Sequence, residues 1–193
     1  MSRWLEVPAH VTENPGELPG GFRAAGVACG IKPSGGLDLG LLVCSEPGCV
    51  SAARFTRSGV LAAPVVLTKQ RARLDAIRVV VVNSGNANAA TGRRGLEEAA
   101  KMQGAAAMAG GVSEDQVAVA STGVIGVLLD AAKPIRGIAQ ARSELRPHGH
   151  GDFSEAIQTT DRFAKEVEAD VALPSGTVRL TAQAKGAGMI SPA

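Results

Sequence analysis

The sequence predicts an α/β fold in which sheet layers pack closely against Ala-rich helices. Apolar residues make up 45% of the 193 residues, many of them Ala and Val, and only 3% are aromatic. The run 77–82, β-branched except for Arg78, is typical of a central strand that is buried on both faces. Residues 95–109 predict an Ala-rich helix that ends at Gly110 and Gly111. Small side chains on both kinds of element let the layers approach closely.

The chain is expected to form one α/β domain, residues 20–193, preceded by an arm over residues 1–19 that is polar and punctuated by Pro and Gly. From Gly20 onward, four apolar runs at close spacing predict an antiparallel meander: 22–31, 37–45, 50–56 and 64–68. The turn signal Lys32–Gly36 separates the first two runs. Since no internal repeat divides the rest of the chain, a single domain is the simplest prediction.

Later patterns predict a capping-box turn, a short strand, two helical segments and a hairpin: 113–116, 117–120, 128–145, 153–158, and 165–173 with 177–183. Pro134 lies early in the longer helix, where we expect it to interrupt or kink the chain. The last segment, Lys185–Ala193, is rich in Gly and ends in Pro and Ala. Two interpretations of it remain open, a poorly ordered tail or an end made by cleavage.

Composition excludes two classes of function. The net charge is only +2, and no basic run is interleaved with aromatic residues, so we expect no nucleic-acid partner. No apolar run approaches the roughly 20 residues that span a bilayer, and residues 1–6 do not resemble a signal peptide. We therefore expect a cytoplasmic protein with no membrane association.

The cysteines and histidines do not predict a metal site. Cys29, Cys44 and Cys49 are an odd number of thiols and are expected to be reduced, small and mostly buried. Cys44 and Cys49 could pair with His148 and His150, but no ligand spacing repeats, so we expect no bound metal. The two histidines lie in a Pro- and Gly-containing loop and are expected to be solvated.

Two polar segments follow predicted strands, where functional sites tend to lie. Asn83–Gly92 contains three Asn and two Gly and predicts a tight loop rich in hydrogen bonds. Ser121–Gly126 places adjacent hydroxyl residues beside a glycine. Here the hydroxyl of Thr122 and the neighbouring backbone N–H could converge on a developing oxyanion. A turn with local caps explains the same residues, so the segment alone does not decide.

Four segments in this order resemble the ornithine acetyltransferase family, the glutamate N-acetyltransferases of arginine biosynthesis: Asn83–Gly92, Ser121–Gly126, Thr159–Asp161 and Lys185–Pro192. Phe55–Ser58 and Ala62–Pro64 resemble early segments of the same family. The resemblance extends from about Gly20 to the last residue.

The resemblance implies a precursor that cleaves itself between an Ala and a Thr. The α and β fragments would stay associated, with two αβ pairs forming an (αβ)2 heterotetramer, and this chain resembles the α fragment. The implied fold is an α/β fold of layered helices and sheets, similar in plan to N-terminal-nucleophile hydrolases. The implied reaction is a ping-pong acetyl transfer through the β-chain Thr, from N-acetylornithine to glutamate, giving ornithine and N-acetylglutamate without a cofactor. Whether acetyl-CoA is also a donor stays open.

Family roles are implied for individual residues. Thr122, through its hydroxyl, and Gly123, through its N–H, match the oxyanion hole, while Thr159 and Lys185 match substrate-binding positions. Thr160 and Asp161 are expected only to shape their loop. Ala193 is expected next to the cleavage site. The chain departs from the family here, because in the family two further residues separate the proline of this motif, Pro192, from the cut, so Ala193 is not fixed as the scissile residue.

Two alternative functions are compatible with the sequence. A related self-cleaving amidohydrolase or aminopeptidase would transfer the acyl group to water. A non-catalytic α/β binding module would carry the motifs incidentally. Competition between glutamate and water separates the first from acetyl transfer, and acyl labelling of the β-chain Thr separates the second.

Overall fold

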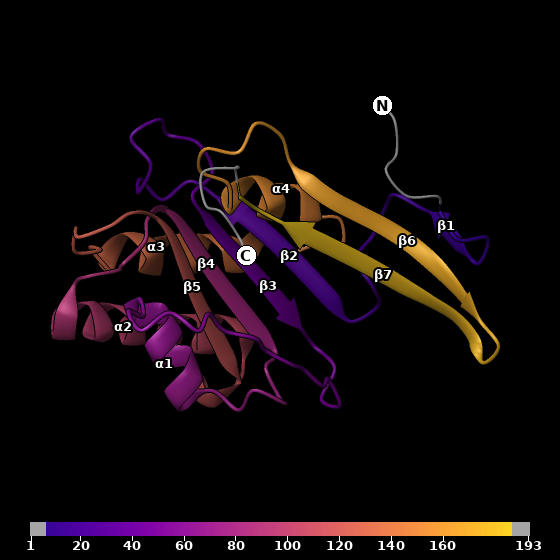
Figure 1. The fold of residues 1–193 in the computed structure, drawn as a ribbon, viewed down its shortest axis with the longest axis horizontal. Coiled ribbons are helices and arrows are strands. Elements are labelled where there is room, and N and C mark those ends of the chain that lie inside the picture. Colours follow the sequence, from indigo (N-terminus) through magenta and orange to yellow (C-terminus); the bar gives the residue numbers. More distant parts are fainter. Residues whose placement is uncertain (1–6, 187–193) are drawn as a thin grey trace.

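The computed structural model describes residues 7–186, which form two sheets and a set of surrounding helices (Figure 1). A four-stranded sheet has the order β2-β3-β4-β5, and a three-stranded sheet has the order β1-β6-β7. The strands are β1 Val11–Glu13, β2 Phe22–Val27, β3 Leu39–Cys44, β4 Val79–Asn86, β5 Val117–Val124, β6 Lys165–Leu173 and β7 Gly176–Ala184. The helices are α1 Ala63–Arg71, α2 Gly92–Gly110, α3 Ala132–Glu144 and α4 His150–Ala156, with the 3₁₀ turn η1 Glu114–Gln116.

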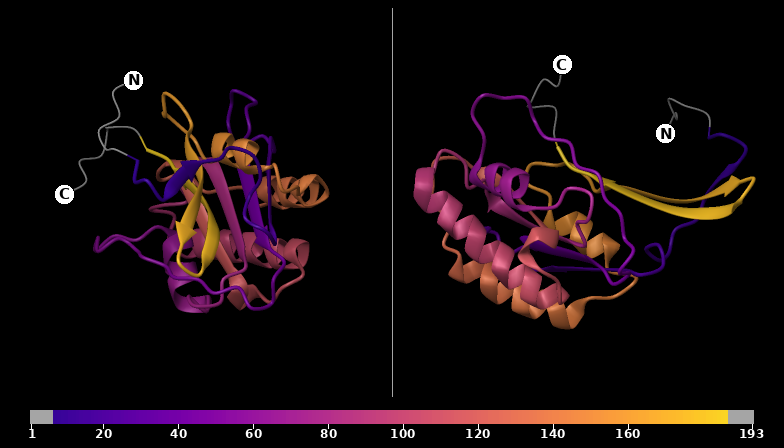
Figure 2. Two further views of the ribbon diagram at one scale, coloured as in Figure 1. Left: turned by 90° about the vertical axis from the view of Figure 1, so that its right-hand side faces the viewer. Right: turned by 90° about the horizontal axis from the view of Figure 1, so that it is seen from below.

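The four-stranded sheet is the centre of the molecule. β2 pairs with β3, and β3 with β4, in antiparallel orientation, whereas β4 and β5 run parallel and are connected through α2. Alternate side chains of the strands, among them Leu41 and Val81, pack against α2 and α3 in the main apolar core. On the opposite face Phe153 and Ile157, at and after α4, form a second cluster with Ala24. Figure 2 shows the long helices on one face and the β6–β7 hairpin on the other.

The expected α/β architecture is confirmed, and most predicted elements form. The strands near 22–31, 37–45, 77–82 and 117–120, the helices near 95–109, 128–145 and 153–158, and the terminal hairpin are all present. The segment expected to be an arm contributes β1, which pairs with β6. Pro134 lies in the first turn of α3 and does not interrupt it, because N–H groups of a first turn have no intrahelical partner to lose.

Two further local predictions are wrong. Residues 64–68 lie in α1, where Pro64 is tolerated in the first turn and Lys69 and Arg71 lie in the last. Residues 50–56 form no strand. Instead, the Ser51 hydroxyl donates to Leu74 O and accepts from Ile77 N, which fixes this segment as a connection. The turn predicted at 113–116 does form, as η1, although Ser113 makes no capping bond through its side chain.

No helix among the described residues is long and apolar enough to span a membrane.

Candidate functional site

The site begins where the parallel strands β4 and β5 end side by side. The register pairs Gly85 with Gly123 and then shifts at Asn86, which is a β-bulge. Gly123 has φ +134°, and a Cβ there would lie 2.3 Å from the backbone carbon of Gly85. Only glycine fits this close approach. β5 therefore includes Thr122 and Gly123 and carries both at its end. A turn, one of the two interpretations of Ser121–Gly126 from the sequence, does not form at these two residues.

Three asparagines of the segment Asn83–Gly92 support this strand end. Asn83, Asn86 and Asn88 are buried, and each amide bonds within this segment or to an adjacent one. Asn83 donates to Asn86 O at 2.9 Å and accepts from the Ser121 hydroxyl at 2.6 Å, which ties β4 to β5. Asn86 donates to Val127 O at 3.0 Å, and Asn88 donates to Gly95 O at 2.9 Å. The predicted density of hydrogen bonds is confirmed, but Asn83–Asn86 belong to β4 and not to a loop. The bond between Asn83 and Ser121 fixes the strand end that carries Thr122 and Gly123.

Lys185 connects three segments that are far apart in the sequence. Its Nζ donates to Thr122 Oγ1 at 2.6 Å and to Thr159 Oγ1 at 3.2 Å. Lys185 follows directly after β7, while Thr159 lies in the connection between α4 and β6. Three of the residues expected in the site are therefore brought together, with Gly123 adjacent in the chain. Thr160 is exposed. Ala193 lies outside the described residues.

Asp161 organises the Lys185 segment. Its side chain is 1% exposed and accepts from Lys165 Nζ at 2.7 Å, from Gly186 N at 2.6 Å and from Thr159 N at 3.2 Å. The Lys165 bond above all, with the two backbone N–H groups, holds the pKa of this carboxyl well below its usual range and outweighs desolvation. The expectation that Asp161 shapes its loop is too narrow, because it also fixes the backbone beside Lys185.

Sequence reasoning missed two charged residues near the site, Asp38 and Lys32. Desolvation would raise the pKa of Asp38. The backbone N–H groups of Cys29, Lys32 and Ile31 donate to its carboxylate, and together they bring the pKa below its usual value. Lys32 packs beside Gly85, and burial lowers its pKa although Asp38 acts in the opposite direction. The turn signal at 32–36 indicated the loop. Nothing in the sequence indicated that it folds against the end of β4.

His150 is not solvated, contrary to expectation. It begins α4, its side chain is 16% exposed, and its ring contacts Gly16 O and Glu168. His148 is largely exposed and pairs with Glu17 at 2.9 Å. The three cysteines are free, as expected, and Cys44 is buried.

The Thr122 site has the chemistry of an anion-binding pair next to a cation. Lys185 donates to the Thr122 oxygen, so the Thr122 O–H can donate to another atom. The backbone N–H of Gly123 follows it in the chain. Such donors can stabilise an oxyanion, and the ammonium group can bind a carboxylate.

Comparison with known proteins identifies the family. Residues 23–193 match the ArgJ family. The chain belongs to the ArgJ family. It is 46% identical over 176 residues to the arginine biosynthesis bifunctional protein ArgJ of Symbiobacterium thermophilum, and the match covers 90% of this chain but 44% of that protein. The corresponding protein of Bacillus subtilis is 43% identical, with 90% and 42% covered. The chain thus spans less than half the length of these relatives.

Solved ArgJ-family structures have the same fold. The ornithine acetyltransferase of Mycobacterium tuberculosis, solved in complex with ornithine, superposes with a TM-score of 0.82 at 39% identity, covering 91% of this chain and 93% of that chain. The ArgJ protein of Bacillus halodurans superposes with a TM-score of 0.84 at 37% identity, covering 95% and 97%. The predicted α/β fold of the ornithine acetyltransferase type is confirmed.

Proposed function

We propose that this chain is the α part of an ornithine acetyltransferase that moves acetyl from N-acetylornithine to glutamate. The observation that carries the proposal is the 2.6 Å contact between Lys185 Nζ and Thr122 Oγ1 beside Gly123. Thr122 O–H and Gly123 N–H would donate to the oxyanion of the tetrahedral intermediate. Lys185 and Thr159 would bind the amino-acid substrate, with the ammonium group facing its carboxylate.

The nucleophile would be the N-terminal Thr of a β chain cut from the same precursor. Its hydroxyl oxygen attacks the acetyl carbon while its own α-amine accepts the proton, and the C–N bond of N-acetylornithine breaks. Ornithine leaves with a proton on its amine. The amine of glutamate then attacks the acetyl ester and leaves as N-acetylglutamate, which restores the Thr hydroxyl. Cleavage must come first, because an amide nitrogen cannot serve as this base.

Two observations support a β partner, whereas the (αβ)2 assembly rests on the family resemblance alone. The chain covers 93% of the matched chain of the M. tuberculosis structure but 44% of the S. thermophilum relative, as expected if the solved protein is divided into chains. Next to the site, the large apolar side chains of Val124, Ile125 and Val127 are 58%, 68% and 54% exposed. A second chain over this loop would bury them and exclude water from the acetyl-enzyme.

The proposal is tested with the full-length protein, in which the α and β parts would be made as one precursor. Intact mass should reveal two fragments, and the mass of the shorter one locates the cut relative to Ala193. The purified assembly should transfer acetyl from N-acetylornithine to glutamate. An intact assembly without transfer would contradict the proposal. Acetate release that glutamate does not suppress would indicate the amidohydrolase instead. A parallel reaction with acetyl-CoA and glutamate decides whether there is a second donor.

A further inference from the structure

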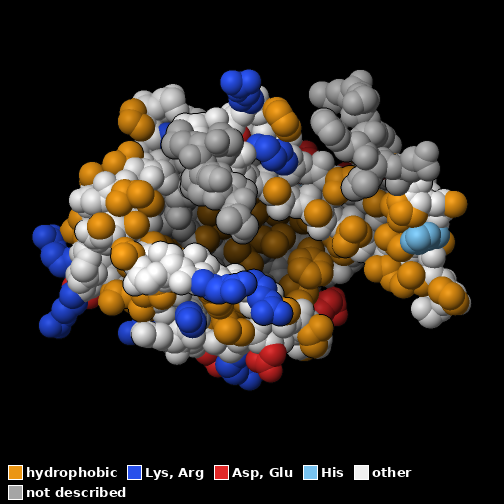
Figure 3. All heavy atoms as spheres, viewed as in Figure 1, with side chains coloured by type: hydrophobic (Ala, Val, Ile, Leu, Met, Phe, Trp, Pro, Cys, Tyr) orange, Lys and Arg blue, Asp and Glu red, His pale blue; other side chains and the backbone are white. Residues whose placement is uncertain are grey.

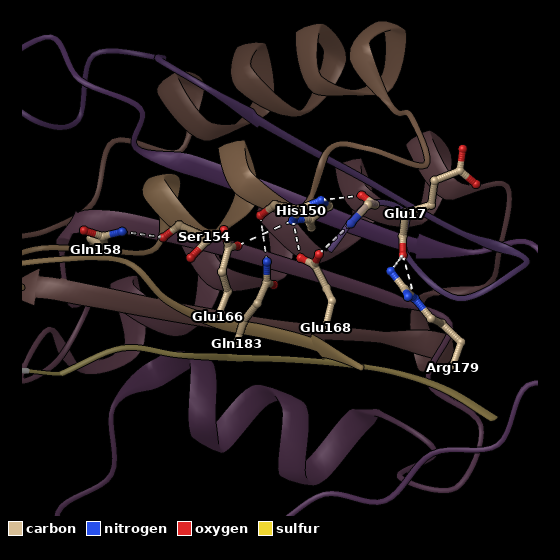
Figure 4. Close-up of polar contacts among 9 residues, drawn as sticks. Glu17, His150, Ser154, Gln158, Glu166, Glu168, Arg179 and Gln183 are labelled. Carbon is tan, nitrogen blue, oxygen red and sulfur yellow. Dashed lines mark hydrogen bonds and ion pairs between the residues drawn. The ribbon is translucent and has the colours of Figure 1, made fainter. Parts of the chain in front are cut away.

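A second cluster of reactive side chains lies along the inner face of the hairpin (Figure 4). Glu166 and Glu168 alternate along β6 and face His150 at the start of α4. His150 Nδ1 lies 2.8 Å from Glu168 Oε1 and 3.5 Å from Glu166 Oε2. One atom from each of the three residues lies within 4.8 Å of the other two, so a single ion can reach all three.

The contacts of the ring indicate which nitrogen is free to bind an ion. Nε2 lies 2.8 Å from Gly16 O, and a carbonyl oxygen only accepts, so Nε2 carries a hydrogen. Nδ1 is buried and faces the two carboxylates, 2.8 Å from Glu168 Oε1 and 3.5 Å from Glu166 Oε2. Because Gly16 O occupies Nε2, Nδ1 is the ring nitrogen that an ion between the carboxylates would contact. A ligand histidine in a metal site has this arrangement, with the other ring N–H bonded to a carbonyl group.

The charges around the cluster favour a cation. Glu168 has a side chain that is only 4% exposed, and Glu166 is 29% exposed. Both line a hollow of about 590 Å³ together with Glu13 and His150, and no Lys or Arg is among the described residues that line it. Arg179, drawn in the same figure, donates to the Glu17 carbonyl and pairs with Asp170 instead. Two carboxylates held this close together, one of them buried, are costly unless a positive charge compensates them.

We propose that His150, Glu166 and Glu168 bind one divalent transition-metal ion of the zinc class. One imidazole and two carboxylates match the ligand preferences of zinc, whereas magnesium and calcium prefer oxygen alone. Three protein ligands leave a position for water. This inference departs from the sequence-based expectation of no metal, and it does not depend on the proposed acetyl transfer.

The ion would fix the base of the hairpin to the body of the molecule. Gly16 N donates to Glu168 Oε2 at 2.9 Å, which joins the N-terminal segment to β6. Gln183 Nε2 donates to His150 O at 2.7 Å, which joins β7 to α4. Lys185 is two residues beyond Gln183. An ion at this cluster would therefore restrain β7, the strand that directly precedes Lys185 and places it next to Thr122.

The test is metal binding by the complete protein after removal of metals with a chelator. We expect one Zn²⁺ per copy of this chain by elemental analysis, and a thermal midpoint that rises with Zn²⁺ concentration. Co²⁺ should give visible absorption without thiolate charge-transfer bands, since no cysteine is a ligand. His150→Gln and Glu166→Gln should each weaken binding more than the roughly 10–100-fold expected for loss of an outer-shell partner.

Matched variants make the result specific. His148→Gln changes a histidine two residues away whose partner is Glu17, so its Zn²⁺ affinity should equal that of the wild type. Cys44→Ser should also leave binding unchanged. Glu166→Gln alters a more exposed ligand and keeps the test decisive if His150→Gln does not fold. The proposal is wrong if no stoichiometric ion binds, if the ligand variants bind Zn²⁺ as the wild type does, or if nitrogen NMR with Zn²⁺ present finds both His150 ring nitrogens protonated.

Discussion

At the scale of single residues, the interaction between Lys185 and Thr122 determines what the site can do. Thr122→Ala removes the hydroxyl that accepts from Lys185 at 2.6 Å and that would donate to the oxyanion. Loss of one such donor should lower the turnover of acetyl transfer by about 10²–10³-fold, roughly 2.7–4 kcal/mol, while the assembly stays intact. Steady-state kinetics with N-acetylornithine measures this loss. Thr160→Ala, an exposed threonine in the neighbouring loop, is the control, and equal rates in both variants would remove Thr122 from the site.

Asp161 is a positioning residue whose effect should depend on pH. Asp161→Asn removes the charge that holds Lys165 Nζ and Gly186 N, so the Lys185 segment should loosen, raising KM for N-acetylornithine and lowering stability. Because the folded-state pKa of Asp161 lies below the usual aspartate value of 3.8, ionised Asp161 stabilises the protein above that pH, and the benefit disappears as pH falls through the folded-state pKa. Urea denaturation should therefore separate wild type and variant at neutral pH and bring them together in strong acid. A pH-independent difference would contradict this.

Residue roles could be predicted only where a motif carried them. Thr122, Thr159 and Lys185 were expected in the site from the family resemblance, and the structure brings them into contact. Their roles remain predictions. Lys32 and His150 were missed because each depends on a neighbour supplied by a distant element, Gly85 for one and Glu168 for the other. Such contacts arise from the tertiary fold and leave no local pattern.

At the scale of elements, sequence periodicity identified most strands and helices but did not settle every short run. The run 77–82 was predictable because its β-branched residues suit a central strand, and most of it lies in β4. The short run 64–68 could not be separated from a strand by pattern alone, and it lies in α1. α1 packs beside β5, which is one of the two edge strands of the four-stranded sheet.

Thr68 explains how α1 closes that edge. Its buried hydroxyl donates to Val119 O at 3.1 Å and accepts from Val119 N at 3.0 Å. Thr68→Val keeps the shape but leaves a buried N–H and C=O without partners, so it should destabilise the fold by about 1–3 kcal/mol. Chemical denaturation measures the loss, and Thr68→Ser, which keeps the hydroxyl, should recover most of it. Equal loss in both variants would assign the effect to packing.

At the scale of the whole molecule, one face carries apolar surface that nothing in the described chain covers. Hydrophobic side chains gather along the hairpin and around the hollow between it and the part that carries α1 (Figure 3). Val167, Val178 and Leu180 on the hairpin are 45%, 48% and 50% exposed. A patch of this kind marks an interface. The chain spans 44% of its S. thermophilum relative, and the β part that we propose is the expected occupant.

Leu180→Ser tests that assignment. If the rest of the protein packs on the hairpin, burying this side chain contributes about 1.5–3 kcal/mol, so the variant should weaken association of the two halves roughly 10–100-fold. Analytical ultracentrifugation of the cleaved protein over a dilution series measures the change. Met108, 74% exposed on α2 on the opposite side of the sheet, provides the control, and Met108→Ser should leave association unaltered. Unchanged association in Leu180→Ser would show that the partner docks elsewhere, with the loop at Val124–Val127 the next surface to alter.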